Sequence, residues 1–116
     1  MFEVRTDTAD DGGVVVVRAA GEVDMTVSPT FERSLLEAAT TSEGRTVVVD
    51  LESLRFLDSS GVHALVKGYH AATAAGGSLT VRGATGVVAR VLYITGVAEA
   101  LGMDFTGEPG ESSKPV

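Results

Sequence analysis

The chain has 116 residues, which is enough for one compact domain around a single core and too few for two. Nine basic residues against sixteen acidic ones give a net charge of −7, a balance that argues against nucleic acid and anionic membranes as partners. The absence of cysteine excludes disulfides, thiolate metal sites and a cysteine nucleophile, and with neither a signal-peptide pattern nor an apolar run of ~20 residues we expect a cytoplasmic protein.

The first two predicted elements are the strands of a β-hairpin. Phe2, Val4 and Thr6 alternate with charged residues, which is the period of a half-buried strand, and residues 10–13 supply the aspartates and glycines of a tight turn. The apolar run at residues 14–17 predicts a second strand that is covered on both faces and lies in the middle of a sheet.

A first helix is predicted to begin at Ser28 and Pro29. The serine oxygen can accept from free backbone N–H groups, and proline at the first helical position gives up no useful donor. The pattern fades at residues 40–44, and before it four apolar residues share one helical face: Phe31, Leu35, Ala38 and Ala39.

Strands and helices then alternate along the chain. Residues 46–51 form a β-branched run typical of a buried strand, and residues 79–82 predict another. A second helix lies between them and ends at Gly76 and Gly77, where glycine permits left-handed geometry. Its apolar residues recur at the helical spacing i, i+3, i+4 and i+7: Val62, Leu65, Val66 and Tyr69.

A third helix is predicted from Val87 to Ile94, with Gly96 as its stop. Residues 103–105 predict a short edge strand. Residues 107–116 consist almost entirely of Gly, Glu, Pro, Ser and Lys, which leaves too little apolar surface to offset the entropy of ordering. We therefore expect one domain over residues 1–106, followed by a flexible tail.

The order of these elements predicts a single α/β domain. Strands separated by helices favour parallel pairing with right-handed crossovers, and the initial hairpin adds an antiparallel pair. We expect a mixed sheet of four or five strands packed with three or four helices.

The segment that says most about function joins the strand at residues 46–51 to the second helix. It contains Asp58, Ser59, Ser60 and Gly61, and loops at the carboxyl ends of parallel strands are where such sheets place their sites. Aspartate and serine are common helix caps, so capping alone explains these residues. Two adjacent hydroxyls are one more than a cap requires, and an exposed hydroxyl at a helix start suits a phosphate. A simple cap and a phosphorylated switch both fit.

This segment and four others resemble the anti-sigma factor antagonists, small bacterial proteins built on the STAS domain. The resemblance extends from the first strand to about Phe105, and the order and spacing of the segments make it specific. In chain order they are Gly21-Glu22-Val23-Asp24, Ser28-Pro29, Val48-Val49-Asp50-Leu51, Phe56-Leu57-Asp58-Ser59-Ser60-Gly61 and Val91-Leu92-Tyr93-Ile94-Thr95-Gly96. Asp-Ser-Ser-Gly in this setting is the family's phosphorylation loop.

The resemblance implies a function and the residues that perform it. Ser59 is the implied phosphate acceptor, the anti-sigma factor is both the binding partner and the serine kinase, and a PP2C-type phosphatase reverses the modification. An unphosphorylated antagonist binds the anti-sigma factor and frees a sigma factor for RNA polymerase, whereas a phosphorylated antagonist dissociates from the anti-sigma factor. The implied partner-binding residues are Glu22, Asp24, Asp58, Ser59, Ser60 and Gly61. We expect a monomer or weak dimer that is not an enzyme and carries no cofactor or metal.

Two departures from the family pattern affect the ends of the domain. Val27 occupies a position where relatives usually have threonine, although Thr26 or Ser28 on either side can supply a capping oxygen. Relatives commonly finish with another helix, whereas residues 107–116 of this chain are predicted to form a tail.

Several residues also have other interpretations. Glu22 and Asp24 are consistent with solvated acids in the turn after the second strand. His63 and His70 lie about two helical turns apart, too far for an i, i+4 metal pair, and a serine hydrolase would need a Gly-x-Ser-x-Gly elbow that the chain lacks. Residues 83–86 lack the Lys-Ser or Lys-Thr pair of a nucleotide-binding loop. The main alternative function is a non-enzymatic STAS subunit of a stress-signalling assembly or a transporter complex.

Overall fold

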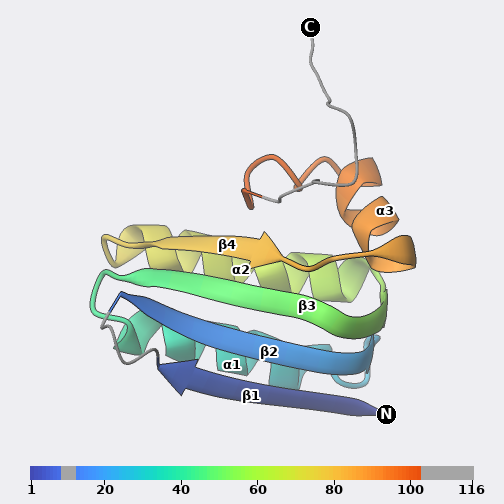
Figure 1. The fold of residues 1–116 in the computed structure, drawn as a ribbon, viewed down its shortest axis with the longest axis horizontal. Helices are drawn as coiled ribbons and strands as arrows, with labels where there is room; N and C mark the ends of the chain where they lie inside the picture. Colours follow the sequence, from blue (N-terminus) through green and yellow to red (C-terminus); the bar gives the residue numbers. More distant parts are fainter. Residues whose placement is uncertain (9–12, 103–116) are drawn as a thin grey trace, which may run out of the picture.

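The computed structural model describes residues 1–8 and 13–102. Most of the predicted hairpin turn, the edge strand expected at residues 103–105 and the tail expected at residues 107–116 lie outside these ranges. The elements are β1 (Phe2–Thr8), β2 (Val14–Val23), α1 (Ser28–Thr41), β3 (Thr46–Leu57), α2 (Ser59–Ala74), β4 (Ser78–Arg82) and α3 (Gly86–Ile94), as drawn in Figure 1.

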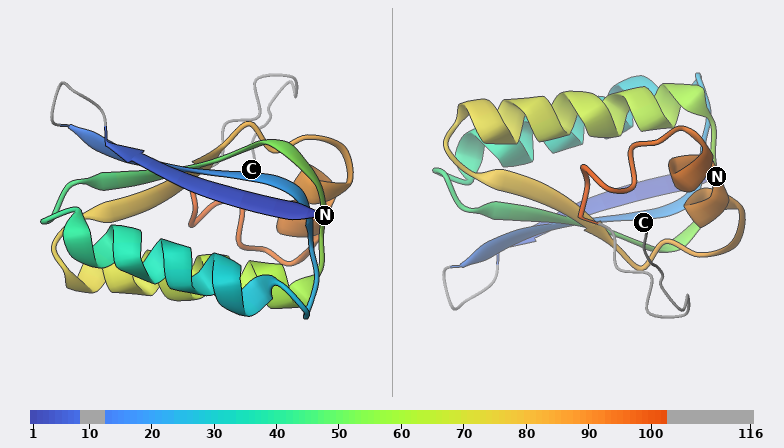
Figure 2. Two further views of the ribbon diagram at one scale, coloured as in Figure 1. Left: turned by 90° about the horizontal axis from the view of Figure 1, so that it is seen from below. Right: turned by 90° about the horizontal axis from the view of Figure 1, so that it is seen from above.

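The described strands form one mixed sheet in the order β1-β2-β3-β4. β1 pairs antiparallel with β2, while β2 with β3 and β3 with β4 pair parallel. The two parallel connections step across the sheet in the same direction, so right-handed crossovers must place their helices on the same face. Figure 2 shows α1 and α2 side by side on that face. The predicted α/β domain with a mixed sheet is confirmed.

β2 lies inside the sheet, as its apolar run predicts, but α1 and α2 cover only one of its faces. Val15, Val17 and Ala19 face these helices and are at most 3% exposed. Val16 points to the opposite face and is 9% exposed, whereas Arg18 on that face is exposed. The expected burial therefore holds for Val15, Val16 and Val17, whereas Val14 is only partly buried and the face becomes polar at Arg18.

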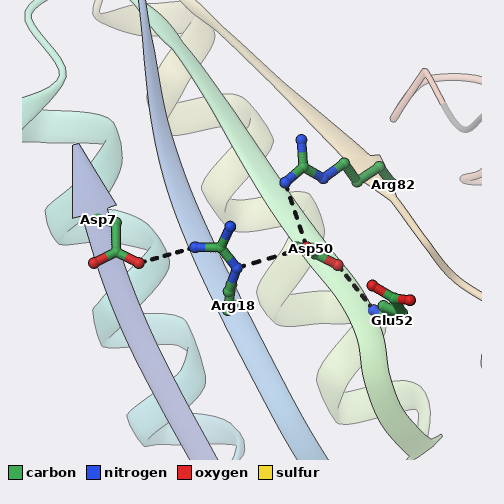
Figure 3. A network of polar contacts seen from close by, with 5 residues as sticks. All are labelled: Asp7, Arg18, Asp50, Glu52 and Arg82. Atoms are coloured by element: carbon green, nitrogen blue, oxygen red, sulfur yellow. Dashed lines mark hydrogen bonds and ion pairs between the residues drawn. The ribbon is translucent and has the colours of Figure 1, made fainter. Parts of the chain in front are cut away.

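A polar network spans all four described strands on the face away from α1 and α2 (Figure 3). The Arg18 guanidinium in β2 lies 2.9 Å from Asp7 in β1 and 3.7 Å from Asp50 in β3. Arg82 in β4 lies 3.4 Å from the same Asp50 oxygen, while the other oxygen of Asp50 accepts from the Glu52 backbone N–H at 3.0 Å. Asp50, with a side chain 13% exposed, is the least exposed member of its ion pairs and links three strands.

β3 continues to Leu57, six residues beyond the end predicted from its β-branched run. Its register against β2 shifts twice, between Arg18 and Ala20 and between Gly21 and Glu22. Each shift inserts an extra β3 residue, and such bulges break the two-residue alternation on which strand prediction depends. The spacing of the buried residues widens from two to three as a result: Val47, Val49, Leu51, Leu54 and Leu57.

α2 packs through small side chains that its predicted apolar pattern did not include. Ala64, Gly68 and Ala72 are buried at four-residue spacing, whereas Val66 and Tyr69 are only partly buried. A Cβ atom placed on Gly68 would lie 3.0 Å from the Leu35 Cβ and 3.2 Å from the Leu79 Cδ1. These small residues let α2 approach both α1 and the sheet closely.

The remaining described chain closes the β4 edge of the sheet. Gly96 has a φ of 81° and stops α3 as predicted. The chain then passes beside β4, where the Leu101 carbonyl accepts from the Val81 N–H at 2.9 Å. None of the helices in the described part is both long and apolar enough to cross a membrane.

Candidate functional site

The junction between β3 and α2 is built around the carboxylate of Asp58. This residue has an extended backbone and caps α2, because its Oδ1 accepts from the N–H groups of Ser60 at 2.9 Å and Gly61 at 3.3 Å. The same oxygen also accepts from the Ser60 hydroxyl at 2.6 Å. The capping interpretation of the sequence is therefore correct for Asp58, and the Ser60 hydroxyl is part of the cap.

Ser59 differs from its neighbour in both exposure and bonding. It is the first residue of α2, its side chain is exposed, and its hydroxyl makes no hydrogen bond to any residue in the described ranges. The backbone N–H groups at the positive end of the helix lie next to it. Of the two adjacent serines, Ser59 is the more exposed, and only the Ser60 hydroxyl is bound to Asp58.

Gly61 lies beneath this loop and is buried. A Cβ atom at this position would lie 2.6 Å from the Leu57 Cδ1 and 3.0 Å from the Val23 Cγ1. Only a residue without a side chain lets the first turn of α2 rest directly on the ends of β2 and β3. The close approach at this glycine is therefore within the chain, and it shapes the loop.

Hydrogen bonds keep the Asp58 side chain ionised. The bond from the Ser60 side chain lowers the pKa of Asp58, partial burial opposes this change, and the backbone N–H groups of Gly61 and Ser60 lower the pKa further. The loop thus carries a fixed negative charge next to the Ser59 hydroxyl.

The acidic residues at the carboxyl end of β2 lie beside the same loop, because the Asp58 N–H donates to the Val23 carbonyl at 3.1 Å. Glu22 is within β2 and not in the turn that follows, where its sequence position suggested it would lie. Its carboxylate contacts the Met1 ammonium group at 2.8 Å and Arg55 at 3.0 Å. The Met1 ammonium, and then Arg55, lower the pKa of Glu22, so this carboxylate stays charged.

Asp24 is exposed and organises the start of α1. Its Oδ1 accepts from the Thr26 N–H at 2.9 Å, and its carbonyl accepts from the N–H groups of Val27 and Ser28. The predicted start of α1 at Ser28 is correct, but the predicted serine cap is wrong. The N-cap residue is Val27, which has helical backbone angles and no side-chain hydrogen bond, and neither Thr26 nor Ser28 supplies a capping oxygen.

Comparison with known proteins assigns this chain to a family. The sequence profile described as STAS domain matches residues 5–107, which is most of the chain. This chain belongs to the STAS domain family. The expected resemblance to anti-sigma factor antagonists is confirmed.

Individual relatives of this STAS domain agree with the family match. A curated anti-sigma F factor antagonist from Paenibacillus polymyxa is 31% identical over 85 residues, which cover 73% of each chain. The crystal structure of an anti-sigma factor antagonist from Mycobacterium paratuberculosis is 25% identical, with a TM-score of 0.74 over 89% of this chain and 85% of that one. Unphosphorylated SpoIIAA, an anti-sigma factor antagonist, shares the fold at 20% identity, with a TM-score of 0.70 over 98% and 89% of the two chains.

Exposed apolar residues near the Ser59 loop of this STAS domain were missed by sequence reasoning. Met25, next to Asp24, is 76% exposed, and Phe56, two residues before Asp58, is 41% exposed. In Figure 1, α3 lies at the same end of the sheet, and its residue Ile94 is 76% exposed. The available signal was a large apolar residue inside a polar turn, as at Met25, because exposed apolar patches often mark interaction surfaces.

The two histidines of the STAS domain do not form a site in the described part of the chain. His63 and His70 are both exposed on α2, and the His70 ring packs edge-on against Tyr69 with 5.6 Å between ring centroids. Within residues 1–8 and 13–102, no group of three or more potential ligands is close enough to hold a metal ion.

Proposed function

We propose that this STAS domain is an anti-sigma factor antagonist whose complex with the anti-sigma factor is switched off by phosphorylation of Ser59. The observation that carries the proposal is the exposed hydroxyl of Ser59, which has no hydrogen bond within residues 1–8 and 13–102, beside a serine whose hydroxyl is bound to Asp58. The relative named as an anti-sigma F factor antagonist supports the general role. In the proposed cycle, the unphosphorylated chain binds the anti-sigma kinase in the cytoplasm and frees a sigma factor, and a PP2C-type phosphatase restores it.

Electrostatics explain how one phosphate can release the partner. Phosphorylation adds about −1.5 to −2 charges at pH 7, and the new group would lie beside the ionised carboxylate of Asp58. The N–H groups of Ser60 and Gly61 already donate to that carboxylate, so they are not free to neutralise the phosphate. Water can solvate the group in the free protein. A partner pressed over the loop would strip that water away, at a cost that can reach several kcal/mol.

The surroundings of Ser59 have the composition of a protein interface. Met25 and Phe56 supply exposed apolar contacts, which are enriched at the centres of interfaces. Asp24 supplies negative charge at the neighbouring strand end, where basic residues of a partner can pair with it. Glu22 adds a second carboxylate there, which the Met1 ammonium and Arg55 already contact. Asp58, Ser60 and Gly61 act by holding the loop in shape.

The test is phosphorylation by a cognate anti-sigma kinase with ATP, followed by mapping of the phosphate by mass spectrometry. We expect phosphate on Ser59 in the wild-type chain and none in Ser59→Ala. In the comparison variant Ser60→Ala, phosphate should still map to Ser59, although loss of the Ser60 bond to Asp58 can slow the modification. Phosphate on Ser60, or undiminished incorporation in Ser59→Ala, contradicts the proposal.

Titration of the complex by calorimetry tests the second half of the mechanism. Ser59→Ala should bind the anti-sigma factor like the wild type but resist release by ATP, whereas Ser59→Asp should bind at least about tenfold more weakly, which corresponds to about 1.4 kcal/mol. Equal affinities of the two variants would place the loop outside the interface.

A further inference from the structure

The two edges of the sheet differ in how they are covered. At the β4 edge, the Leu101 carbonyl bonds the outward N–H of Val81. At the other edge, no residue in the described ranges apart from those of β2 pairs with β1. β1 also keeps an unbroken register with β2 over Phe2–Thr8, without a bulge or a proline. A straight, uncovered edge of this kind is a template for adding another strand.

The hydrogen-bond pattern identifies which β1 residues present their backbone groups outward. The Glu22 N–H donates to the Met1 carbonyl at 3.1 Å, so Met1 and Glu22 are a hydrogen-bonded pair of the antiparallel ladder. Such pairs alternate along the strand, and Glu3, Arg5 and Asp7 therefore bond inward to β2. The N–H and carbonyl groups of the residues between them point away from β2: Phe2, Val4, Thr6 and Thr8.

Two charged side chains on β1 have no partner of opposite charge in the described part of the chain. Arg5 lies directly opposite Arg18 of β2, a like charge, and the Arg18 guanidinium is engaged by Asp7 and Asp50. Glu3 lies opposite Ala20. Both Glu3 and Arg5 are exposed, and neither forms an ion pair within the described part of the chain. Arg5 thus lacks a carboxylate, and Glu3 lacks a cation.

A second copy of the same strand supplies both missing charges. If two β1 strands pair antiparallel about Val4, each Glu3 lies opposite Arg5 of the other copy, and Phe2 lies opposite Thr6. The Glu3–Arg5 positions are non-hydrogen-bonded pairs, in which side chains approach most closely. A register centred on Arg5 would instead oppose Arg5 with Arg5 and Glu3 with Asp7, which are like charges. A register centred on Thr6 would require Asp7, which already binds Arg18.

We propose that this chain forms a homodimer through antiparallel pairing of two β1 strands centred on Val4. The two sheets then continue as one, with the helices of both copies on the same face, and the half-buried Val4 side chains meet across the two-fold axis. The pairing uses neither Ser59 nor its loop, so it can hold whether or not the phosphorylation switch exists. Because one short strand contributes little area, the dimer should be weak and dependent on concentration.

Disulfide trapping tests the register directly, since the wild-type chain has no cysteine. Glu3→Cys and Arg5→Cys proteins should cross-link when mixed under mild oxidation, because opposed residues of a non-hydrogen-bonded pair lie about 4.5 Å apart at Cα, within the range that a disulfide spans. Each protein alone should remain uncross-linked. Cross-linking of Arg5→Cys with itself, or no cross-link in the mixture, overturns the proposal.

Sedimentation equilibrium over a range of concentrations tests the charge pairing. Arg5→Glu should weaken dimerisation about tenfold or more, because two attractive cross-strand pairs become repulsive, and the exchange Glu3→Arg with Arg5→Glu should restore it. Both positions are exposed, so circular dichroism should report an unchanged fold. A wild-type chain that stays monomeric at every concentration, or an Arg5→Glu variant that dimerises normally, overturns the proposal.

Discussion

Ser59 and Ser60 have the same side chain and adjacent positions, yet one carboxylate gives them different chemistry. Oδ1 of Asp58 takes the Ser60 hydroxyl together with two backbone N–H groups, and leaves Ser59 with its oxygen in solvent. The sequence indicated that two hydroxyls exceed what a cap needs, and it predicted the functional site at this loop. Propensity alone was unable to say which hydroxyl completes the cap, because that depends on the extended backbone of Asp58.

Removal of the Asp58 side chain should destabilise the protein in a pH-dependent way. The pKa of Asp58 is lowered by folding, so its contribution is fully present above the unfolded pKa near ~4 and is lost as the pH falls through the lower folded pKa. At pH 7, Asp58→Ala should lower the free energy of unfolding by about 1 kcal/mol, a typical value for a lost N-cap.

Urea unfolding at pH 7 and near pH 3 measures this difference. The gap between wild type and Asp58→Ala should shrink at the lower pH, whereas the control Ser59→Ala should match the wild type at both, since the Ser59 hydroxyl has no bond to lose within the described part. A gap that is constant or larger in acid would contradict an ionised cap.

Elements were predicted well where their periodicity was regular and poorly where it was interrupted. The helix beginning at Ser28 and the glycine stop at Gly96 are confirmed, since each depends on local backbone chemistry. The end of β3 was misplaced because two bulges shift its alternation. The prediction of the packed face of α2 was incomplete. Gly68 is buried by close approach to α1, but a glycine does not contribute to a hydrophobic pattern in the sequence.

Gly61→Ala tests how closely α2 must rest on the strands. The new methyl group would overlap the Leu57 side chain, which is 1% exposed and therefore has no open space into which to move. Overpacking of this kind costs about 1–3 kcal/mol, more than the helix propensity gained on replacing glycine. Thermal or urea unfolding should report the loss, and displacement of the loop should also weaken anti-sigma factor binding.

The matched control for Gly61→Ala lies two residues further along the same helix. His63→Ala removes an exposed side chain and should change stability by less than about 0.5 kcal/mol. If Gly61→Ala is as stable as this control, the contact with Leu57 is not tight in solution.

In the molecule as a whole, the two faces of the sheet have different structural roles. The helix-covered face holds the core. The first parallel crossover brings the end of β3 beside the end of β2, and the second begins there, at the Ser59 loop. The opposite face is polar and is tied together by Asp50 (Figure 3). This arrangement follows from strand order and crossover handedness, which the alternation of strands and helices predicts. The ion pairs on the polar face cannot be predicted in this way, because they depend on the register between neighbouring strands, which a single sequence does not reveal.

Asp50→Ala should separate the stability of the sheet from function. Its loss leaves Arg18 and Arg82 without their shared carboxylate and the Glu52 N–H without its acceptor, so we expect a loss of about 1–2 kcal/mol in the free energy of unfolding. Asp7→Ala, which removes only a half-exposed partner of Arg18, should cost less than about 0.5 kcal/mol. Urea unfolding distinguishes the two.

The anti-sigma factor affinity of Asp50→Ala should equal that of the wild type at a temperature where both are folded, because Asp50 points away from the helix-covered face and contacts neither Asp58 nor Ser59. Equal stabilities of Asp50→Ala and Asp7→Ala would mean that these ion pairs act singly and that the network does not couple the strands. A loss of affinity in folded Asp50→Ala would instead mean that the partner reaches the polar face, and the binding surface would then extend beyond the loop. The two measurements together therefore decide whether the sheet is only a scaffold for Ser59.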